Sequence, residues 1–384
     1  MAKVLVLSER FWPEEFLVND VVRELRSRGD AVEVLTQVPS YPFDKIYDGY
    51  ENKRLQTTYW DGVPVHRVNT WFGYNKSAKR KILNYLHFGW RTFWWAFRHG
   101  RAYDRVVVVH TAALTMASAV YALKKRWRKP ITIWTQDLWP DAVWGYGIRK
   151  TRFREFVLNA FVKSIYACCD RVAVSCPSYV GRLKEITGRD AEFIPQWEPT
   201  MIAGRAPHQK GDGEKRVFMF AGNLGVPQNL DNDIEGFLKA GVANAELWIL
   251  GGGVRFEELK ARYGSSPGVK FMGRQPKDSM PEWFAKADVL IISLTRAYSG
   301  TLPGKFQSYC AAAKPILGII EGSAADLIRD NGLGVVSAPD DVNAIADGYR
   351  QMMSADLVSM GARSRSLSET MFNREQCLRD LLRV

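Results

Sequence analysis

Cysteine is scarce in this chain of 384 residues, and long apolar runs are missing. The five cysteines, an odd number without a C-x-x-C pair, argue against a disulfide framework or a zinc site and for reduced thiols in a cytoplasm. No uncharged apolar run approaches the ~20 residues that span a bilayer. Met1-Ala-Lys3 leads straight into a strand-like run, so no signal peptide is expected.

Common nucleotide-binding signatures are also missing, because no Walker A loop occurs and no G-x-G-x-x-G follows a strand-like run. Acidic residues are outnumbered by basic ones, 41 to 53, and the formal net charge is +12. Such a charge favours an anionic partner: nucleic acid, a small molecule or a membrane surface. We expect no nucleic-acid partner, because the basic residues are spread along the chain and no recognised binding motif is present.

Short apolar runs alternate with helical patterns in both halves of the chain, which predicts parallel sheets covered by helices. Pro195–Glu214 interrupts the alternation with Pro, Gly and polar residues. The expected fold class is therefore α/β, with two doubly wound, Rossmann-like domains facing across a cleft. The predicted parts are a first domain over 1–196, a linker over 197–214, a second domain over 215–365, and a C-terminal helix over 366–384 that can pack back on the first domain.

One segment of the second half favours an anionic ligand. A buried-strand pattern over Asp288–Leu294 is followed by a Gly- and Pro-containing turn, then Lys305 and a helix of small residues. Backbone N–H groups at such a turn, beside an ammonium group, suit a diphosphate. Gly222–Gly225 is a second candidate phosphate turn, whereas Gly251–Gly253 is better explained as a turn that needs positive φ.

Polar residues follow other predicted strands. Arg274, next to Gln275, could clamp a diphosphate, or could be an exposed loop residue. His110 ends one predicted strand of the first half, and Asp137 follows the next one. A functional and a structural role remain open for both, and for Asp137 the structural role is a helix N-cap. The first loop carries an acidic and aromatic rim suited to sugar hydroxyls and ring faces, formed by Glu9, Trp12, Glu14 and Glu15.

The segment 74–101 combines aromatic and basic residues at helical spacing. Aromatic side chains beside Lys and Arg suit a bilayer interface with anionic headgroups. The alternatives are a core helix with a solvated basic face and, with less support, a nucleic-acid surface. The residues predicted to touch the membrane are Lys79, Arg80, Trp90 and Trp94.

Taken together, these segments resemble family 4 glycosyltransferases with the GT-B fold, of the bacterial exopolysaccharide and O-antigen type that includes colanic acid enzymes. The resemblance covers essentially the whole chain. Its carriers in the first half are SERFWPEEFLVNDVVRELRSRGDAVEVLT, VPSYPFDKIYDGY and TQDLWPDA. Those in the second half are FAGNLG, WILGGG, FMGRQP, ADVLIISL and LPGKFQSYCAAAKPIL.

The resemblance implies a nucleotide-sugar donor on the second domain, an acceptor on the first, retention of anomeric configuration, and no metal or other cofactor. Family residues are matched by His110, Lys305, Gly222–Gly225, Thr301 and Leu302. We expect the catalytic residues to be His110, Asp137, Arg274 and Lys305. The expected donor contacts are Gly222, Asn223, Leu224, Gly225, Gln275, Ser299, Gly300, Thr301, Leu302, Lys305 and Ser308. The expected acceptor contacts are Glu9, Trp12, Glu14, Glu15 and Trp139.

The chain departs from the family pattern at two positions that often hold glutamate, which are Gly300 and Ser308 here. We expect a retaining glycosyltransferase that moves a sugar, from a UDP-sugar rather than a GDP-sugar, to a polyprenyl-diphosphate-linked glycan in cell-surface polysaccharide synthesis. It would be attached peripherally to the inner face of the plasma membrane. The alternatives are another GT-B enzyme, such as a nucleotide-sugar epimerase, and a non-catalytic transferase partner.

Overall fold

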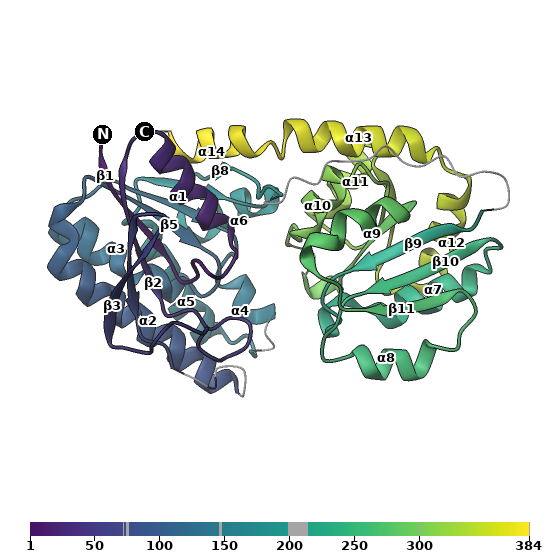
Figure 1. Cartoon of the computed structure of the whole chain (residues 1–384), viewed down its shortest axis with the longest axis horizontal. Helices are drawn as coiled ribbons and strands as arrows, with labels where there is room; N and C mark the ends of the chain where they lie inside the picture. The colour runs from purple at the N-terminus through teal and green to yellow at the C-terminus, as the bar shows by residue number, and fades with distance from the viewer. Residues whose placement is uncertain (72, 74–76, 146–147, 199–213, 299, 384) are drawn as a thin grey trace. The chain divides into compact units, whose positions relative to one another are not determined.

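The computed structural model describes residues 1–71, 73, 77–145, 148–198, 214–298 and 300–383 (Figure 1). The chain forms two compact units. The N-terminal unit comprises Met1–Pro195 with Cys377–Val384, and the C-terminal unit comprises Gln196–Gln376. Most of the predicted linker, 197–214, lies outside the described residues.

The N-terminal unit is built on an eight-stranded sheet with the order β3-β4-β2-β1-β5-β6-β7-β8. Every neighbouring pair is parallel except the antiparallel hairpin β3–β4. The strands are β1 (Lys3–Ser8), β2 (Ala31–Gln37), β3 (Leu55–Trp60), β4 (Val63–Val68), β5 (Arg105–His110), β6 (Ile131–Thr135), β7 (Arg171–Val174) and β8 (Glu192–Phe193). The β3–β4 hairpin was not predicted from the apolar runs of the sequence, because β3 alternates exposed and half-buried residues.

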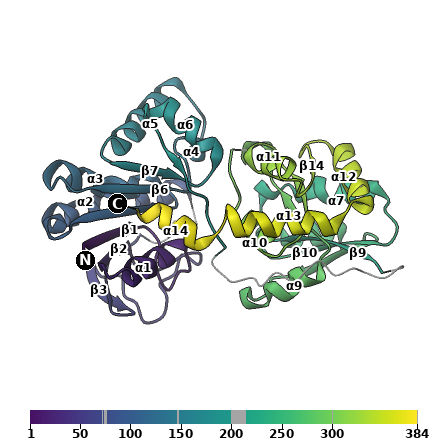
Figure 2. The same cartoon turned by 90° about the horizontal axis from the view of Figure 1, so that it is seen from above.

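Helices cover both faces of this sheet. In Figure 1, α1 (Leu17–Ser27) lies above it with the C-terminal helix α14 (Arg374–Leu382), and α2 (Ala78–His99) lies below it. The helix α5 (Arg152–Tyr166) packs beside α6 (Pro177–Thr187), as Figure 2 shows. The remaining helical segments are η1 (Gly100–Ala102), η2 (Leu114–Ser118), α3 (Ala119–Tyr121), η3 (Ala122–Arg126) and α4 (Asp141–Gly145).

Three arginines hold α14 in the N-terminal unit. Arg28 and Arg105 donate to the Leu382 carbonyl at 3.4 Å, and Arg171 donates to the Leu381 carbonyl at 2.8 Å. Cations there stabilise the last carbonyls of a helix, which lack partners within it. The single helix predicted over 366–384 is wrong in its bounds, because α13 (Leu357–Thr370) ends before α14 begins.

The C-terminal unit has a fully parallel six-stranded sheet in the order β11-β10-β9-β12-β13-β14. The strands are β9 (Arg216–Ala221), β10 (Ala245–Leu250), β11 (Val269–Gly273), β12 (Val289–Ser293), β13 (Ile316–Ile319) and β14 (Gly334–Ser337). The remaining helical segments are η4 (Val226–Gln228), α7 (Leu230–Ala240), α8 (Phe256–Tyr263), η5 (Lys277–Ser279), α9 (Met280–Lys286), η6 (Arg296–Tyr298), α10 (Lys305–Ala311), α11 (Ser323–Asp330) and α12 (Val342–Ser354).

The order of the strands reverses once in each sheet, between β1 and β5 and between β9 and β12. In doubly wound sheets, the crevice outside the carboxyl ends of two such strands is the usual place for a ligand. The strand order therefore singles out one edge of each unit. The prediction of two doubly wound α/β domains is confirmed for each unit by itself.

Candidate functional site

Two glycine turns pack against each other at the carboxyl ends of β9 and β10. Gly222 has φ +149° and Gly251 has φ +134°. A Cβ on Gly251 would stand 1.8 Å from the Gly222 carbonyl oxygen, so no other residue fits there without moving the backbone. The prediction that Gly251–Gly253 is a turn requiring positive φ is confirmed, since Gly253 also has φ +157°.

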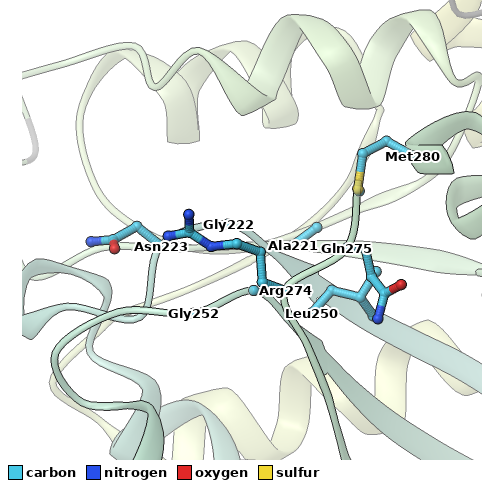
Figure 3. Close-up of a pocket in the computed structure, with 9 residues that line it drawn as sticks. Ala221, Gly222, Asn223, Leu250, Gly252, Arg274, Gln275 and Met280 are labelled. Atoms are coloured by element: carbon cyan, nitrogen blue, oxygen red, sulfur yellow. The ribbon is translucent and has the colours of Figure 1, made fainter. Parts of the chain in front are cut away.

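These turns border a cavity of about 330 Å³ in the C-terminal unit. Its lining comes from the ends of β9, β10 and β11 and from the start of α9, and consists of Ala221, Gly222, Asn223, Leu250, Gly251, Gly252, Arg274, Gln275 and Met280. In Figure 3 the Arg274 side chain extends across the cavity with its guanidinium directed toward Asn223. The Arg274 Nε lies 3.6 Å from the position of a Cβ on Gly252. The volume is within the range of small-molecule pockets.

Lys305, the first residue of α10, places its ammonium group beside Gly222, one of the residues that line this cavity. Its Nζ atom lies 3.8 Å from the centroid of the Phe220 ring and 2.9 Å from the position of a Cβ on Gly222. The Nζ atom is buried and has no hydrogen-bond partner among the described residues. Burial lowers the pKa of Lys305 to about 7, partly offset by the charge of Asp233. Two predicted residues far apart in sequence, Gly222 and Lys305, are thus in contact.

Asp233 on α7 was missed in the sequence. Its side chain is buried, and it accepts a hydrogen bond of 2.6 Å from the Tyr349 hydroxyl. Burial raises the pKa of Asp233 to about 7, against the lowering effects of Tyr349 and Lys305. The signal available in the sequence was spacing, because Asp233 stands three positions after Leu230 and four before Phe237 and so shares the apolar face of α7.

The turn before Lys305 uses its polar groups internally. The Thr301 amide and hydroxyl both donate to the Tyr298 carbonyl, at 3.2 and 2.9 Å. Leu302 is buried, Gly300 is exposed, and Ser299 lies outside the described residues. The helix α10 has only seven residues. In this segment the Lys305 side chain is therefore a better candidate for binding an anion than the N-terminus of the helix.

Other predicted donor contacts also have partners. The Leu224 and Gly225 amides donate to the Gly252 carbonyl and to Gln228 Oε1, both at 3.0 Å, and Gln275 Nε2 donates to the Met272 carbonyl at 2.8 Å. Ser308, at a family glutamate position, donates to the carboxylate of Glu198. Glu198 stands in a segment predicted to be linker, so its place beside α10 could not be anticipated.

In the N-terminal unit, His110 ends β5 at the reversal of strand order. It is fully buried, and its Nε2 lies 3.0 Å from the Ala112 carbonyl, so Nε2 carries the proton. The Nδ1 atom has no hydrogen-bond partner among the described residues. Burial lowers the pKa of His110 to about 4, which leaves a neutral imidazole with an available lone pair at neutral pH.

Asp137 follows β6, and burial raises the pKa of its carboxyl to about 7 despite the opposing charge of Lys81. No hydrogen bond to this carboxyl occurs within the described part of the chain, which disfavours an N-cap role. Lys81 belongs to α2 and lies in the segment 74–101, whose basic and aromatic residues predict a membrane surface. In the structure its charge also acts on Glu9 and Arg10, so it belongs to this strand edge instead.

The acidic rim predicted for the first loop is wrong for Glu9 and Glu14, because both side chains are buried. Glu9 pairs with Arg10 at 3.0 Å, and Glu14 Oε1 accepts from the amides of Ser40 and Tyr41 at 2.8 and 2.7 Å. Burial is the largest cause of the raised pKa of each glutamate. These carboxylates hold the loops at the strand edge and do not form an open sugar-binding rim.

The other predicted acceptor residues are more accessible. Glu15 is exposed, while Trp12 and Trp139 are half-buried. Trp12 stacks on Trp60 with ring centroids 6.1 Å apart, and its carbonyl accepts from the buried Arg67 at 2.6 Å. The structure therefore offers aromatic surface at this edge.

The helix α2 has one buried and one exposed face. Asn84, Phe88, Thr92 and Ala96 are buried, whereas Lys79, Arg80, Leu86 and Trp90 are exposed and Trp94 is half-buried. The alternative of a core helix with a solvated basic face accounts for the buried side and for the exposed cations, but not for the exposed Leu86 and Trp90.

Within the described residues, no three His, Cys, Asp or Glu side chains gather as metal ligands would. All five cysteines are buried, and none of them forms a disulfide. No described helix combines the length and the apolar character needed to cross a membrane.

Two family models match the chain. A glycosyl transferase 4-like domain matches residues 16–197, and a glycosyl transferases group 1 model matches residues 215–355. WbjE of Pseudomonas aeruginosa, named as a glycosyltransferase, is 26% identical over 265 residues, which are 64% of each chain and so less than two thirds of that relative. WcaI of Escherichia coli (strain K12), named as a colanic acid biosynthesis glycosyl transferase, is 22% identical over 99% of this chain and 98% of its own.

Solved structures agree in fold. Sucrose-phosphate synthase from Thermosynechococcus elongatus has a TM-score of 0.74 at 14% identity, covering 99% of this chain and 97% of its own. Anabaena HepE in complex with UDP-glucose has a TM-score of 0.69 at 12% identity, with 99% and 98% covered. With both halves matched by family models and the strand order of each unit doubly wound, the chain belongs to the family 4 glycosyltransferases of GT-B fold.

Proposed function

We propose that the protein transfers a sugar from a nucleotide-sugar donor, a UDP-sugar, with retention of anomeric configuration. The observation that carries the proposal is the buried Lys305 ammonium beside Gly222, a residue that lines the cavity together with Arg274. Two cations beside glycine turns suit a diphosphate, because the backbone can approach the phosphates closely. HepE, a structural neighbour, binds UDP-glucose.

In this mechanism, Lys305 and Arg274 offset the negative charge that grows on the departing nucleoside diphosphate as the glycosidic bond breaks. Their positive charge serves the purpose for which other transferases use a metal, so we propose a metal-independent reaction without a cofactor. The acceptor hydroxyl then attacks from the face that the diphosphate leaves. Its oxygen forms the new glycosidic bond and its proton passes to the departing diphosphate, so no protein nucleophile is required.

The N-terminal unit would bind the acceptor. The Asp137 carboxylate would accept a hydrogen bond from the acceptor hydroxyl and orient it, and the neutral His110 could accept one from a sugar hydroxyl at Nδ1. The half-buried Trp12 and Trp139 would offer ring faces to the glycan. WcaI, which is named for colanic acid biosynthesis, favours a place in surface-polysaccharide synthesis, and we propose a polyprenyl-diphosphate-linked glycan as the acceptor.

Such an acceptor lies in a membrane, and the exposed Leu86 and Trp90 of α2, with Lys79 and Arg80, would attach the protein peripherally to an anionic inner face. A nucleotide-sugar epimerase would act on soluble substrates and would not need this surface. Partition onto anionic vesicles therefore separates the two functions.

Calorimetric titration with UDP, GDP, dTDP and CMP tests the donor site directly. We expect UDP to bind selectively to the wild type and to bind more weakly to Lys305→Ala. If no nucleotide binds, the proposal fails and a non-catalytic role as the partner of an active transferase takes its place. Selective binding of GDP would correct the donor class alone.

The affinity for UDP should also depend on pH. The pKa of Lys305 is lowered to about 7, so the ammonium form is lost as the pH rises through 7. We expect affinity to increase as pH falls from about 8.5 to about 6.5, by up to ~10-fold per pH unit above the pKa. The diphosphate titrates as well, so the informative quantity is the difference between the wild-type slope and the smaller slope expected of Lys305→Ala. Equal slopes would contradict the role of this ammonium.

Asp137→Asn should lower turnover by ~10- to 100-fold at pH 8, as expected for loss of a charge-assisted hydrogen bond of ~1.5–3 kcal/mol. The pKa of Asp137 is raised to about 7, so its active, ionised form appears as pH rises through 7. Because the Lys305 ammonium is lost over the same range, wild-type turnover should pass through a maximum near pH 7, and the variant should lose the rise on the acidic side of that maximum. Asp141→Asn is the control, because Asp141 is nearby and its carboxylate pairs with Arg182 at 2.7 Å.

A further inference from the structure

The helix α5 exposes an apolar stripe that neither the sequence patterns nor the proposed chemistry explains. Phe153 is 77% exposed, Phe156 is 72% exposed, and Val157 is 46% exposed. Their spacing of three and four positions places them on one face of the helix. The residues that pack α5 into the unit, Val162 and Ile165, are fully buried, so the exposed stripe does not contribute to the core.

Basic residues surround the amino-terminal half of this stripe. Arg149 and Lys150 precede α5, and Arg152 and Arg154 alternate with the exposed aromatic residues. Lys150 is paired with Glu155 at 2.9 Å. Two large aromatic side chains set among cations are typical of a surface that enters the headgroup region of an anionic bilayer.

The same side of the N-terminal unit carries the exposed face of α2. Both α2 and α5 pack against η2, and right-handed crossovers place the helices that follow β4, β5 and β6 on one face of the sheet. The sequence of α2 contains no Asp or Glu, and the segment from Ala78 to Lys129 contains one acidic residue, Asp104. This helix layer therefore combines exposed aromatic residues with an excess of positive charge.

We propose that α5 is a second membrane-docking element, which inserts Phe153 and Phe156 into the interface of an anionic bilayer together with α2. The proposal extends the membrane attachment of the proposed function and does not depend on the transfer chemistry. Attachment by two helices would fix the tilt of the N-terminal unit on the membrane surface. Attachment by one helix alone would leave the unit free to rotate about the axis of that helix.

Charge complementarity selects the bilayer over a second copy of the chain as the occupant. If two copies met through this face, Arg152 and Arg154 of one would approach basic residues of the other, and like charges would repel. Anionic headgroups would instead neutralise them, and each basic residue near such a surface adds to the attraction.

Co-sedimentation with vesicles of equimolar phosphatidylglycerol and phosphatidylcholine tests the proposal. The α5 variant is Phe153→Ser with Phe156→Ser, and the α2 variant is Leu86→Ser with Trp90→Ser. Phe43→Ser is the matched control, because Phe43 is 66% exposed in the same unit but lies in the loop after β2. We expect each double variant to lower partitioning by ~10-fold or more, the control to match the wild type, and pure phosphatidylcholine vesicles to bind all variants weakly.

The substituted side chains are exposed, so circular dichroism and thermal unfolding should match the wild type. UDP binding should also be unchanged, which separates this inference from the donor site. Wild-type partitioning by the α5 variant, alongside a loss in the α2 variant, would overturn the inference and leave the α2 attachment standing. Concentration-dependent dimers that disappear in the α5 variant would overturn it in favour of a second copy. If the wild type does not bind the anionic vesicles, both this inference and the proposed membrane attachment fail.

Discussion

Alanine at Lys305 should reduce turnover by ~10²–10³-fold, the usual cost of removing one group that stabilises developing negative charge. Stability should not fall with it. The Nζ atom is buried without a hydrogen-bond partner among the described residues. Burying a charge that has no hydrogen-bond partner opposes folding. We therefore expect a thermal midpoint equal to or above that of the wild type, together with a large loss of sugar transfer from a UDP-sugar.

Lys270→Ala is the matched control for this substitution. Lys270 is a lysine of the same unit on β11, and it pairs with Glu246 at 2.7 Å instead of lying near the cavity. Its loss should leave turnover close to wild type. Near-normal turnover of Lys305→Ala would remove Lys305 from the mechanism, and an unfolded variant would contradict the stability argument.

Alanine at Gly251 should abolish nucleotide binding, whereas alanine at Gly252 should be tolerated. The two glycines are adjacent and both line the cavity. A Cβ on Gly251 would stand 1.8 Å from the Gly222 oxygen, on a residue whose φ is +134°, while a Cβ on Gly252 would meet nothing closer than Arg274 Nε at 3.6 Å. Only Gly251→Ala would force the two glycine turns apart.

The expected destabilisation for Gly251→Ala is ~3 kcal/mol, at the upper end of overpacking effects. Urea unfolding and UDP calorimetry of both variants measure the two consequences. If Gly251→Ala bound UDP as tightly as the wild type, the interlocked turns would not shape the nucleotide site. If Gly252→Ala also lost binding with normal stability, the cavity would be narrower around the ligand than this geometry indicates.

The sequence by itself was sufficient for the fold class. Runs of β-branched residues, such as Arg105–His110, are buried on both faces of a sheet, and the glycines that follow strands mark the turns. Gly222, Arg274 and Lys305 could be chosen as donor-site candidates because each follows a predicted strand. Position after a strand is a local property, and it places a residue at a known edge of a parallel sheet.

Other features needed the tertiary structure, because they depend on contacts between segments far apart in the chain. Burial of Glu9 and Glu14 follows from their partners, Gln37 and the amides of Ser40 and Tyr41. Whether Asp233 is ionised depends on Tyr349 and Lys305, because both act on the pKa of its carboxyl group. No spacing in the sequence indicates such neighbours.

Exposure is the clearest example of this difference. Phe153 and Phe156 are three positions apart and therefore share one face of α5, but this spacing does not show whether that face is buried. The structure turns that face outward, because Val162 and Ile165 already fill the contact with the rest of the unit. Periodicity determines which residues of a helix share a face, but only the packing of distant elements determines whether that face meets the core or the surroundings.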